Sequence, residues 1–328
     1  MMALKGRGTL LLGIVLMLLL FSFFALSVGS AEIESPWSHI FSPSLPGPAH
    51  DVIWQIRFPR VLAALLIGAA LGVAGVLSQS ATNNPLADPS IIGTSAGASL
   101  GATIAILLNI ADIGTLPTTI AAVIGALLAT LLTFASSRSA LQLVIVGIAT
   151  SALLSALVGL ILTIANRPDA RSISFWSLGS LALVTPKTIY LLAPTILTTS
   201  AVAWFISQKL DLLALGDREV RFLGLNPQRM RLIAFILIAI LIATAVSTVG
   251  SIAFLALAAP HITRFLIGPR NRSLIIGSAL VGAALLLLAD TAARTVAPPF
   301  ELPIGLITSL IGAPILILLL RRSGEVWR

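Results

Sequence analysis

Residues 189–249 read IYLLAPTILTTSAVAWFISQKLDLLALGDREVRFLGLNPQRMRLIAFILIAILIATAVSTV. Two apolar runs, Ile189 to Ile206 and Leu232 to Val249, enclose Gln208 to Arg231, the densest cluster of charge in a chain that is only 10% charged. An apolar run of roughly 17 to 25 residues is long enough to cross the hydrocarbon core of a bilayer as a helix. The stretch therefore predicts two membrane-spanning helices joined by a charged segment outside the membrane.

The rest of the chain repeats this pattern. Of its 328 residues 57% are hydrophobic, which is more apolar sequence than the interior of a soluble domain could bury. We therefore expect an all-α polytopic membrane protein with about ten transmembrane helices in a single domain, residues 1–328. The ten apolar runs are Thr9 to Val28, Val61 to Leu77, Ile91 to Ile110, Leu116 to Phe134, Leu141 to Ala165, Ile189 to Ile206, Leu232 to Val249, Ile252 to Ile267, Leu274 to Ala289 and Ile304 to Leu320.

The Lys and Arg residues predict the orientation. With ten spans and the N-terminus inside, only six of the 20 basic residues would lie outside, which obeys the positive-inside rule and puts both termini in the cytoplasm. The seventh and eighth runs are separated only around Gly250, and merging them would move the C-terminus to the other side. The net charge of +8 thus reflects topology and gives no reason to propose nucleic acid as a partner.

The first run, residues 9–28, has two interpretations. Lys5 and Arg7 precede it and small residues follow it, as in a signal peptide. Its apolar core is longer than the roughly 7 to 15 residues of a signal peptide, which favours a retained first span. Residues 29–58 would then form an external loop.

The charged segment, residues 208–231, predicts two short helices. Residues 212–215 end at Gly216, and Asp217 to Leu223 begins with an N-cap residue and ends at Gly224. In the second helix Val220 and Leu223 are expected on one face. Two capped helices favour a cytoplasmic docking surface, and the alternative is a solvated loop.

Two stripes of small residues recur at four-residue spacing. Gly93, Gly97 and Gly101 form the first, and residues 147–163, with Ser151 and Ser155, form the second. In lipid such stripes let helices approach closely, so ordinary packing within one subunit is one interpretation. The hydroxyl groups of the second stripe make a pathway wall or subunit seam equally plausible.

Catalytic and metal-binding patterns are absent from the sequence. It has no phosphate-binding loop, no H-E-x-x-H motif and no cysteine, and its three histidines are scattered. Asp290 is the one acid near a span end, and Arg294 follows at the spacing of an ion pair. We expect no catalytic residue, no metal site and no cofactor in this chain.

Four motifs go beyond composition: RFPR at 57–60, NPLADP at 84–89, PHITR at 260–264 and ELPIGLITSLIGAP at 301–314. In this order they closely resemble the FecCD-type permeases of bacterial ABC importers for iron siderophores, haem and vitamin B12. The stretch GSIAFLALAAPHI departs mildly from the more usual GxIxFVGLxxPHI. The resemblance covers essentially the whole chain after the first span.

The resemblance implies a type II ABC importer architecture in the bacterial plasma (inner) membrane. Two permease copies or homologues would pair with two cytoplasmic ATP-binding subunits, which use the ATP, and an extracytoplasmic binding protein would deliver the cargo. The expected cargo is a ferric siderophore, with haem or cobalamin as alternatives. A secondary carrier without an ATPase is the alternative from another class, and the scarcity of buried acids argues against it.

The resemblance also implies residue roles. Arg57, Arg60 and Arg294 match external arginines that meet acidic residues of the binding protein. The alternatives are snorkelling at the membrane interface or, for Arg294, an internal pair with Asp290. The residues expected to couple to the ATPase are Asp217, Arg218, Glu219, Arg221, Leu223 and Gly224.

The inner gate is expected at two cytoplasmic turns. Asn84 and Leu86 lie on the first turn, and Ala140 and Leu141 lie near the second. A rigid turn fixed by Pro85 is the alternative for the first. Ser151 and Ser155 are expected to line the pathway.

Overall fold

A computed structural model describes residues 2–30, 33–41, 47–113, 115–137, 140–165, 173–174, 176–298 and 300–323. Each of the ten apolar runs corresponds to one substantial helix in the described part, which confirms the all-α class. These helices are α1 (Met2–Ser27), α4 (Phe58–Thr82), α5 (Thr94–Leu107), α6 (Leu116–Ala135), α7 (Ala140–Ile164), α9 (Pro186–Asp211), α11 (Pro227–Val249), α12 (Leu255–Ile267), α13 (Asn271–Thr295) and α14 (Ile304–Ser323). Seven are long and apolar enough to cross a membrane, and α5, α12 and α14 contribute shorter apolar segments.

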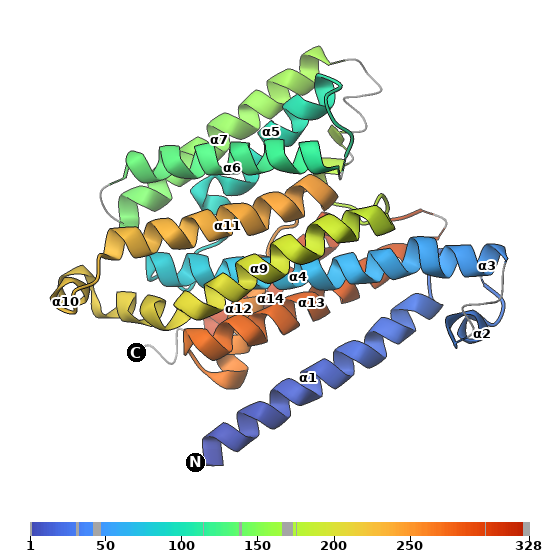
Figure 1. Cartoon of the computed structure of the whole chain (residues 1–328), viewed down its shortest axis with the longest axis horizontal. Helices are drawn as coiled ribbons and strands as arrows, with labels where there is room; N and C mark the ends of the chain where they lie inside the picture. Colours follow the sequence, from blue (N-terminus) through green and yellow to red (C-terminus); the bar gives the residue numbers. More distant parts are fainter. Residues whose placement is uncertain are drawn as a thin grey trace.

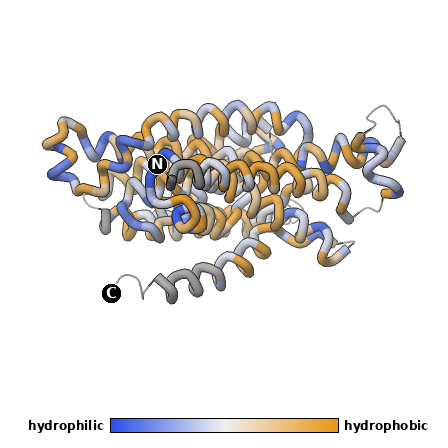
Figure 2. Tube along the Cα trace, turned by 90° about the horizontal axis from the view of Figure 1, so that it is seen from below, coloured by the Kyte–Doolittle hydropathy of each residue, from blue (hydrophilic) through white to orange (hydrophobic). Residues whose placement is uncertain are grey.

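Short helical elements connect these spans. They are α2 (Pro36–Phe41), α3 (Pro48–Asp51), the π-helix η1 (Val52–Arg57), the 3-10 helices η2 (Pro89–Ile92) and η3 (Leu212–Leu215), and α10 (Asp217–Phe222). The predicted external loop, residues 29–58, is therefore partly helical. Residues 48–57 of this loop are helical and continue directly into α4, so the continuous helix extends well beyond the apolar run that predicts it. Hydrophilic residues gather at the two ends of the bundle, and hydrophobic residues fill the length between them (Figure 2).

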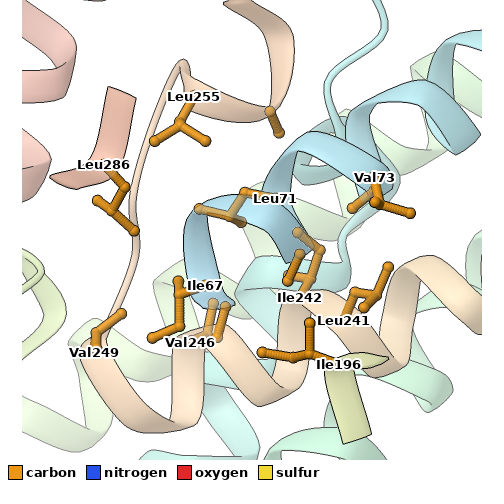
Figure 3. Close-up of a cluster of buried hydrophobic side chains, with 14 of the residues drawn as sticks. Ile67, Leu71, Val73, Ile196, Leu241, Ile242, Val246, Val249, Leu255 and Leu286 are labelled. Carbon is orange, nitrogen blue, oxygen red and sulfur yellow. The ribbon is translucent and has the colours of Figure 1, made fainter. Parts of the chain in front are cut away.

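The helix α4 lies at the centre of the bundle, against α9, α11, α12 and α13 (Figure 1). Glycines allow this close approach, because a Cβ atom on Gly68 or Gly72 would collide with the backbone of α13, and one on Gly75 with that of α12. Around these close helix contacts, large hydrophobic side chains from several helices fill the core (Figure 3). Ile67 of α4 and Ile242 of α11 are among those that are almost fully buried.

A second layer is formed by α5, α6 and α7 (Figure 1). Gly97 and Gly101 face the backbone of α6 at Gly125 and Ala121, so the first small-residue stripe serves packing within the chain. The second stripe differs: a Cβ at Gly159 would meet open space, and α7 leaves most of its surface uncovered by this chain. The two stripes thus have different roles.

The seventh and eighth predicted spans are separate helices. Helix α11 ends at Val249, and α12 begins at Leu255 after a non-helical stretch. The Ser180 amide donates to the Val249 carbonyl, and Phe254 has a φ of 64°, a left-handed conformation that is uncommon for a bulky residue. This stretch lines a cavity, as non-helical backbone at membrane depth requires.

Candidate functional site

A buried ionic cluster lies where the N-terminal end of α4 meets the C-terminal end of α13. Arg60 Nε donates to Asp290 Oδ1 at 2.8 Å, and Arg60 Nη1 donates to both carboxylate oxygens of Glu301 at 3.0 and 2.9 Å. Arg294 Nε lies 3.3 Å from Asp290 Oδ2, which is the ion pair expected from the sequence spacing. Asp290 is fully buried, so two arginines neutralise a carboxylate that would otherwise be costly at this depth.

Two arginines also bind the end of α1. Arg57 Nη1 donates to the carbonyls of Leu26 and Ser27 at 3.0 and 2.9 Å, and Arg294 donates to those of Ala25 and Val28. The last carbonyls of a helix have no partner within the helix and lie at the negative end of its dipole, so cations stabilise them. This contact anchors α1, of whose span only 17% is buried by the rest of the chain.

The expected external arginines are therefore not displayed at the surface. Arg57, Arg60 and Arg294 are 4%, 5% and 2% exposed. Arg294 forms the internal pair with Asp290 that the sequence offered as the alternative to an external role. The reason is that a buried guanidinium is stable only with hydrogen-bonded partners, and this chain supplies them.

Two adjoining cavities lie in the bundle, the larger between α5 and α7 and the smaller against α4, α11 and α12. The larger, of about 480 Å³, is lined without any charged residue, and Ser151 and Ser155 belong to its wall; that this cavity is part of the pathway stays a prediction. Its serines are Ser90, Ser95, Ser99, Ser151, Ser155, Ser177 and Ser251. The smaller, of about 280 Å³, shares Ser90, Ser95 and Ser251. The wall of the larger cavity offers hydroxyl groups to a passing solute without a fixed charge that would trap it, whereas Asp88 lines the smaller one.

The predicted gate residues of the first turn have different positions. Leu86 lines the smaller cavity, whereas Asn84 shapes the turn, because its Oδ1 accepts the Leu86 amide at 2.9 Å. The side chains of Ala140 and Leu141 lie outside the described residues. Among the described residues no group of three or more His, Asp or Glu could hold a metal ion, so the cavities offer no coordination site in that part of the chain.

The charged segment forms a compact element from η3 and α10 at one end of the bundle (Figure 1). Gly216 follows η3 and Gly224 lies just beyond α10, where both were predicted to end a helix; their φ values are 100° and 77°. The prediction of a separate first helix over residues 212–215 is wrong, because η3 continues directly from α9. Asp217 is also not the N-cap: Gly216 takes that position.

Asp217 instead anchors the element. Arg231 Nη1 and Nη2 donate to its two carboxylate oxygens at 2.9 and 2.6 Å, and Arg231 Nε donates to the Ala81 carbonyl at 3.0 Å. These hydrogen bonds hold the pKa of Asp217 below its usual range, although partial burial opposes the shift. Asn83 Nδ2 adds a bond to the Leu213 carbonyl at 2.7 Å. The element is thus fixed to the ends of α4 and α11.

One surface of the element is apolar and exposed. The expectation that Val220 and Leu223 share a face is wrong, since Val220 is fully buried and Leu223 is 57% exposed. The cause is that α10 ends at Phe222, so Leu223 leaves the helical periodicity. Phe222 and Leu215 are also exposed, and the Arg218 guanidinium lies over the Phe222 ring.

Comparison with known proteins identifies the family. The FecCD transport family matches residues 15–322, nearly the whole chain. The chain belongs to the FecCD transport family. The hemin transport system permease protein HmuU of Yersinia pestis is 38% identical over 98% of both chains. The iron(3+)-hydroxamate import system permease protein FhuB of Bacillus subtilis is 37% identical over 97% of this chain and 84% of its own.

A solved structure agrees with this FecCD fold. An inward-facing metal-chelate type ABC transporter superposes with a TM-score of 0.86 and 32% identity, over 96% of this chain and 99% of that one. This FecCD protein is therefore a multi-pass permease subunit of an ABC importer for iron chelates, with a type II importer fold. It is not itself catalytic, because ATP is hydrolysed by a partner ATPase subunit.

Several features of this FecCD permease were missed in the sequence. Glu301 lies in a quoted motif, but its distance from Arg60 in the chain hides the pair. The exposed aromatic Phe222 within a short charged helix is a signal that could have been used, because large exposed apolar groups indicate contact surfaces. Arg231 appeared only as one more basic residue in the topology.

Proposed function

We propose that this chain forms the membrane path for a ferric siderophore in a bacterial plasma membrane. Both termini lie in the cytoplasm in this proposal, which rests on the distribution of Lys and Arg. The observation that carries the choice of cargo is the serine-rich wall of the larger cavity. A siderophore surrounds its metal with oxygen ligands and presents polar groups outward, which hydroxyls can solvate without a fixed charge.

A second permease copy would complete the path. The cavity opens beside α7, whose surface is largely uncovered by the rest of the chain. Serine hydroxyls that face lipid would be poorly satisfied, whereas a facing copy would turn them into the wall of an aqueous conduit. The stripe of small residues on α7 also lets a second backbone approach closely.

Two ATP-binding subunits would grip the charged element formed by η3 and α10 in the cytoplasm. Leu215, Phe222 and Leu223 provide an apolar contact, and Arg218 and Arg221 provide charge at its edge. Exposed aromatic and aliphatic groups of this kind suit an apolar cleft in a partner protein. An external binding protein would meet the outer face over α4 and α13, near the ionic cluster.

Cargo competition tests this proposal. Cells that depend on this permease, together with the binding protein and ATPase encoded with it, should take up radiolabelled iron presented as a hydroxamate siderophore. Unlabelled siderophore should abolish the signal, and haem or cobalamin in excess should leave it unchanged. Uptake that responds to haem alone would replace the siderophore with haem as cargo, and uptake that persists without the ATPase would indicate a secondary carrier.

A further inference from the structure

The ionic cluster at the outer face is closed to any partner in this structure. Its two arginines, Arg60 and Arg294, and the neighbouring Arg57 are each at most 5% exposed, and all three bind groups of this chain. A carboxylate of a docking protein can therefore reach an arginine only if a group of this chain gives up its place.

The two carboxylates of the cluster differ in how easily they can leave. Asp290 lies within α13, is fully buried and contacts both Arg60 and Arg294. The Glu301 side chain is 28% exposed and, among the described residues, pairs only with Arg60. It also lies in the non-helical residues between α13 and α14, where backbone movement breaks no helical hydrogen bond. Glu301 is the replaceable partner.

Replacing one carboxylate by another avoids the main cost of opening the cluster. Removing a partner from a buried arginine leaves an uncompensated charge, which is strongly unfavourable. An incoming Asp or Glu side chain can accept the same hydrogen bonds from Arg60 Nη1, so the arginine stays neutralised throughout. The remaining cost is the difference between the free energies with which the two carboxylates bind Arg60.

We propose that Glu301 is an internal substitute for the binding protein's carboxylate: it occupies Arg60 in the undocked permease and yields the site on docking. This inference rests on the proposed function, because it requires an external binding protein. Displacement also has a structural consequence, since Glu301 lies three residues before α14. The amides of Ile304 and Gly305 at the start of α14 donate to the carbonyls of Gly179 and Leu178, close to the cavity-lining Ser177. Docking is thereby linked to the segment that leads into α14.

The test is a binding titration with Glu301→Gln. The permease–ATPase complex in lipid nanodiscs is titrated with the cargo-loaded binding protein encoded with it. Removing an internal competitor should tighten binding, with a Kd lower by on the order of tenfold. Glu301→Asp keeps the charge but shortens the reach, so it should give a smaller decrease in Kd and serves if the glutamine variant does not fold.

Glu34→Gln is the matched control, because Glu34 lines an outer cavity beside Arg294 and forms no ion pair among the described residues. It removes the same charge without freeing Arg60, so its Kd should stay within about twofold of the native value. In an Arg60→Gln background, Glu301→Gln should have no further effect on the Kd.

An unchanged or weaker affinity of a folded Glu301→Gln complex would overturn the inference, as would an equal gain in Glu34→Gln. These results leave the importer function intact, because the native complex still binds. If the native complex does not bind the protein at all, the docking part of the proposed function fails as well, so the two failures are distinguishable.

Discussion

Arg231 at the start of α11 binds both carboxylate oxygens of Asp217 at the start of α10, at 2.9 and 2.6 Å, while its Nε binds the last turn of α4 through Ala81. One guanidinium thus joins the charged element formed by η3 and α10 to two membrane helices. Because the arginine fork is planar and directional, it fixes the angle of α10 as well as its position. Motion applied to α10 is expected to reach α4 through this contact.

Breaking the Arg231–Asp217 pair should separate ATP hydrolysis from transport. Arg231→Lys keeps the charge but lacks the planar fork that binds both Asp217 oxygens and the Ala81 carbonyl through three nitrogens, so transport per ATP should fall on the order of tenfold while the chain still folds. Uptake and ATPase activity are measured together in proteoliposomes. Arg229→Lys is the control, because the Arg229 side chain is exposed. Equal coupling in the Arg231→Lys and native proteins would remove this pair from the mechanism.

The exposed apolar surface of α10 should bind the ATPase. Phe222→Ala is expected to weaken assembly with the ATP-binding subunits by on the order of tenfold, because exposed aromatic anchors dominate such contacts. Fold stability should not change, since the Phe222 ring is 79% exposed. Phe205→Ala removes a similarly exposed ring on α9 and should leave assembly intact. Co-purification measures both, and parallel losses would argue against a specific contact.

The serine wall predicts a steric effect on transport. Ser155→Leu adds bulk to the larger cavity and should slow uptake of a bulky chelate several-fold without changing fold stability. Thr163→Leu adds comparable bulk two turns along α7, away from the residues that line the cavity. If both variants transport at the native rate, the cavity does not belong to the path.

The anchor of α1 predicts a stability effect. Arg294→Gln removes a partner of Asp290 and the bonds to Ala25 and Val28, so it should destabilise the fold by about 3–5 kcal/mol, as the loss of one partner from a buried pair does. Thermal unfolding in detergent measures the change. Arg218→Gln alters an exposed arginine and should stay within about 0.5 kcal/mol of the native protein. A native-like unfolding temperature for Arg294→Gln would contradict the anchoring role.

Local signals in the sequence accounted for the spans and for contacts within one helix. Each apolar run became a helix because lipid leaves the backbone no other way to satisfy its hydrogen bonds. The Asp290–Arg294 pair followed from spacing alone. The Arg60–Asp290 and Arg60–Glu301 pairs did not, because more than two hundred residues separate the partners and only the packing of α4 on α13 joins them.

The errors in the charged segment have a similar origin. Helical periodicity put Leu223 beside Val220, but the helix ends one residue earlier, and the side-chain direction changes there. Asp217 resembled an N-cap because Asp favours that position. Its carboxylate binds Arg231 instead, fourteen residues later, and a pair across a turn is not visible from periodicity.

Under the proposed function, this permease moves a ferric siderophore only when its partner hydrolyses ATP. The most direct measurement uses proteoliposomes that contain the permease with its ATPase, with siderophore-loaded binding protein on one side and ATP on the other. We predict siderophore accumulation that requires both ATP and the binding protein and is lost with Arg231→Ala. Accumulation without ATP, or none with any siderophore under full ATP turnover, would contradict the account.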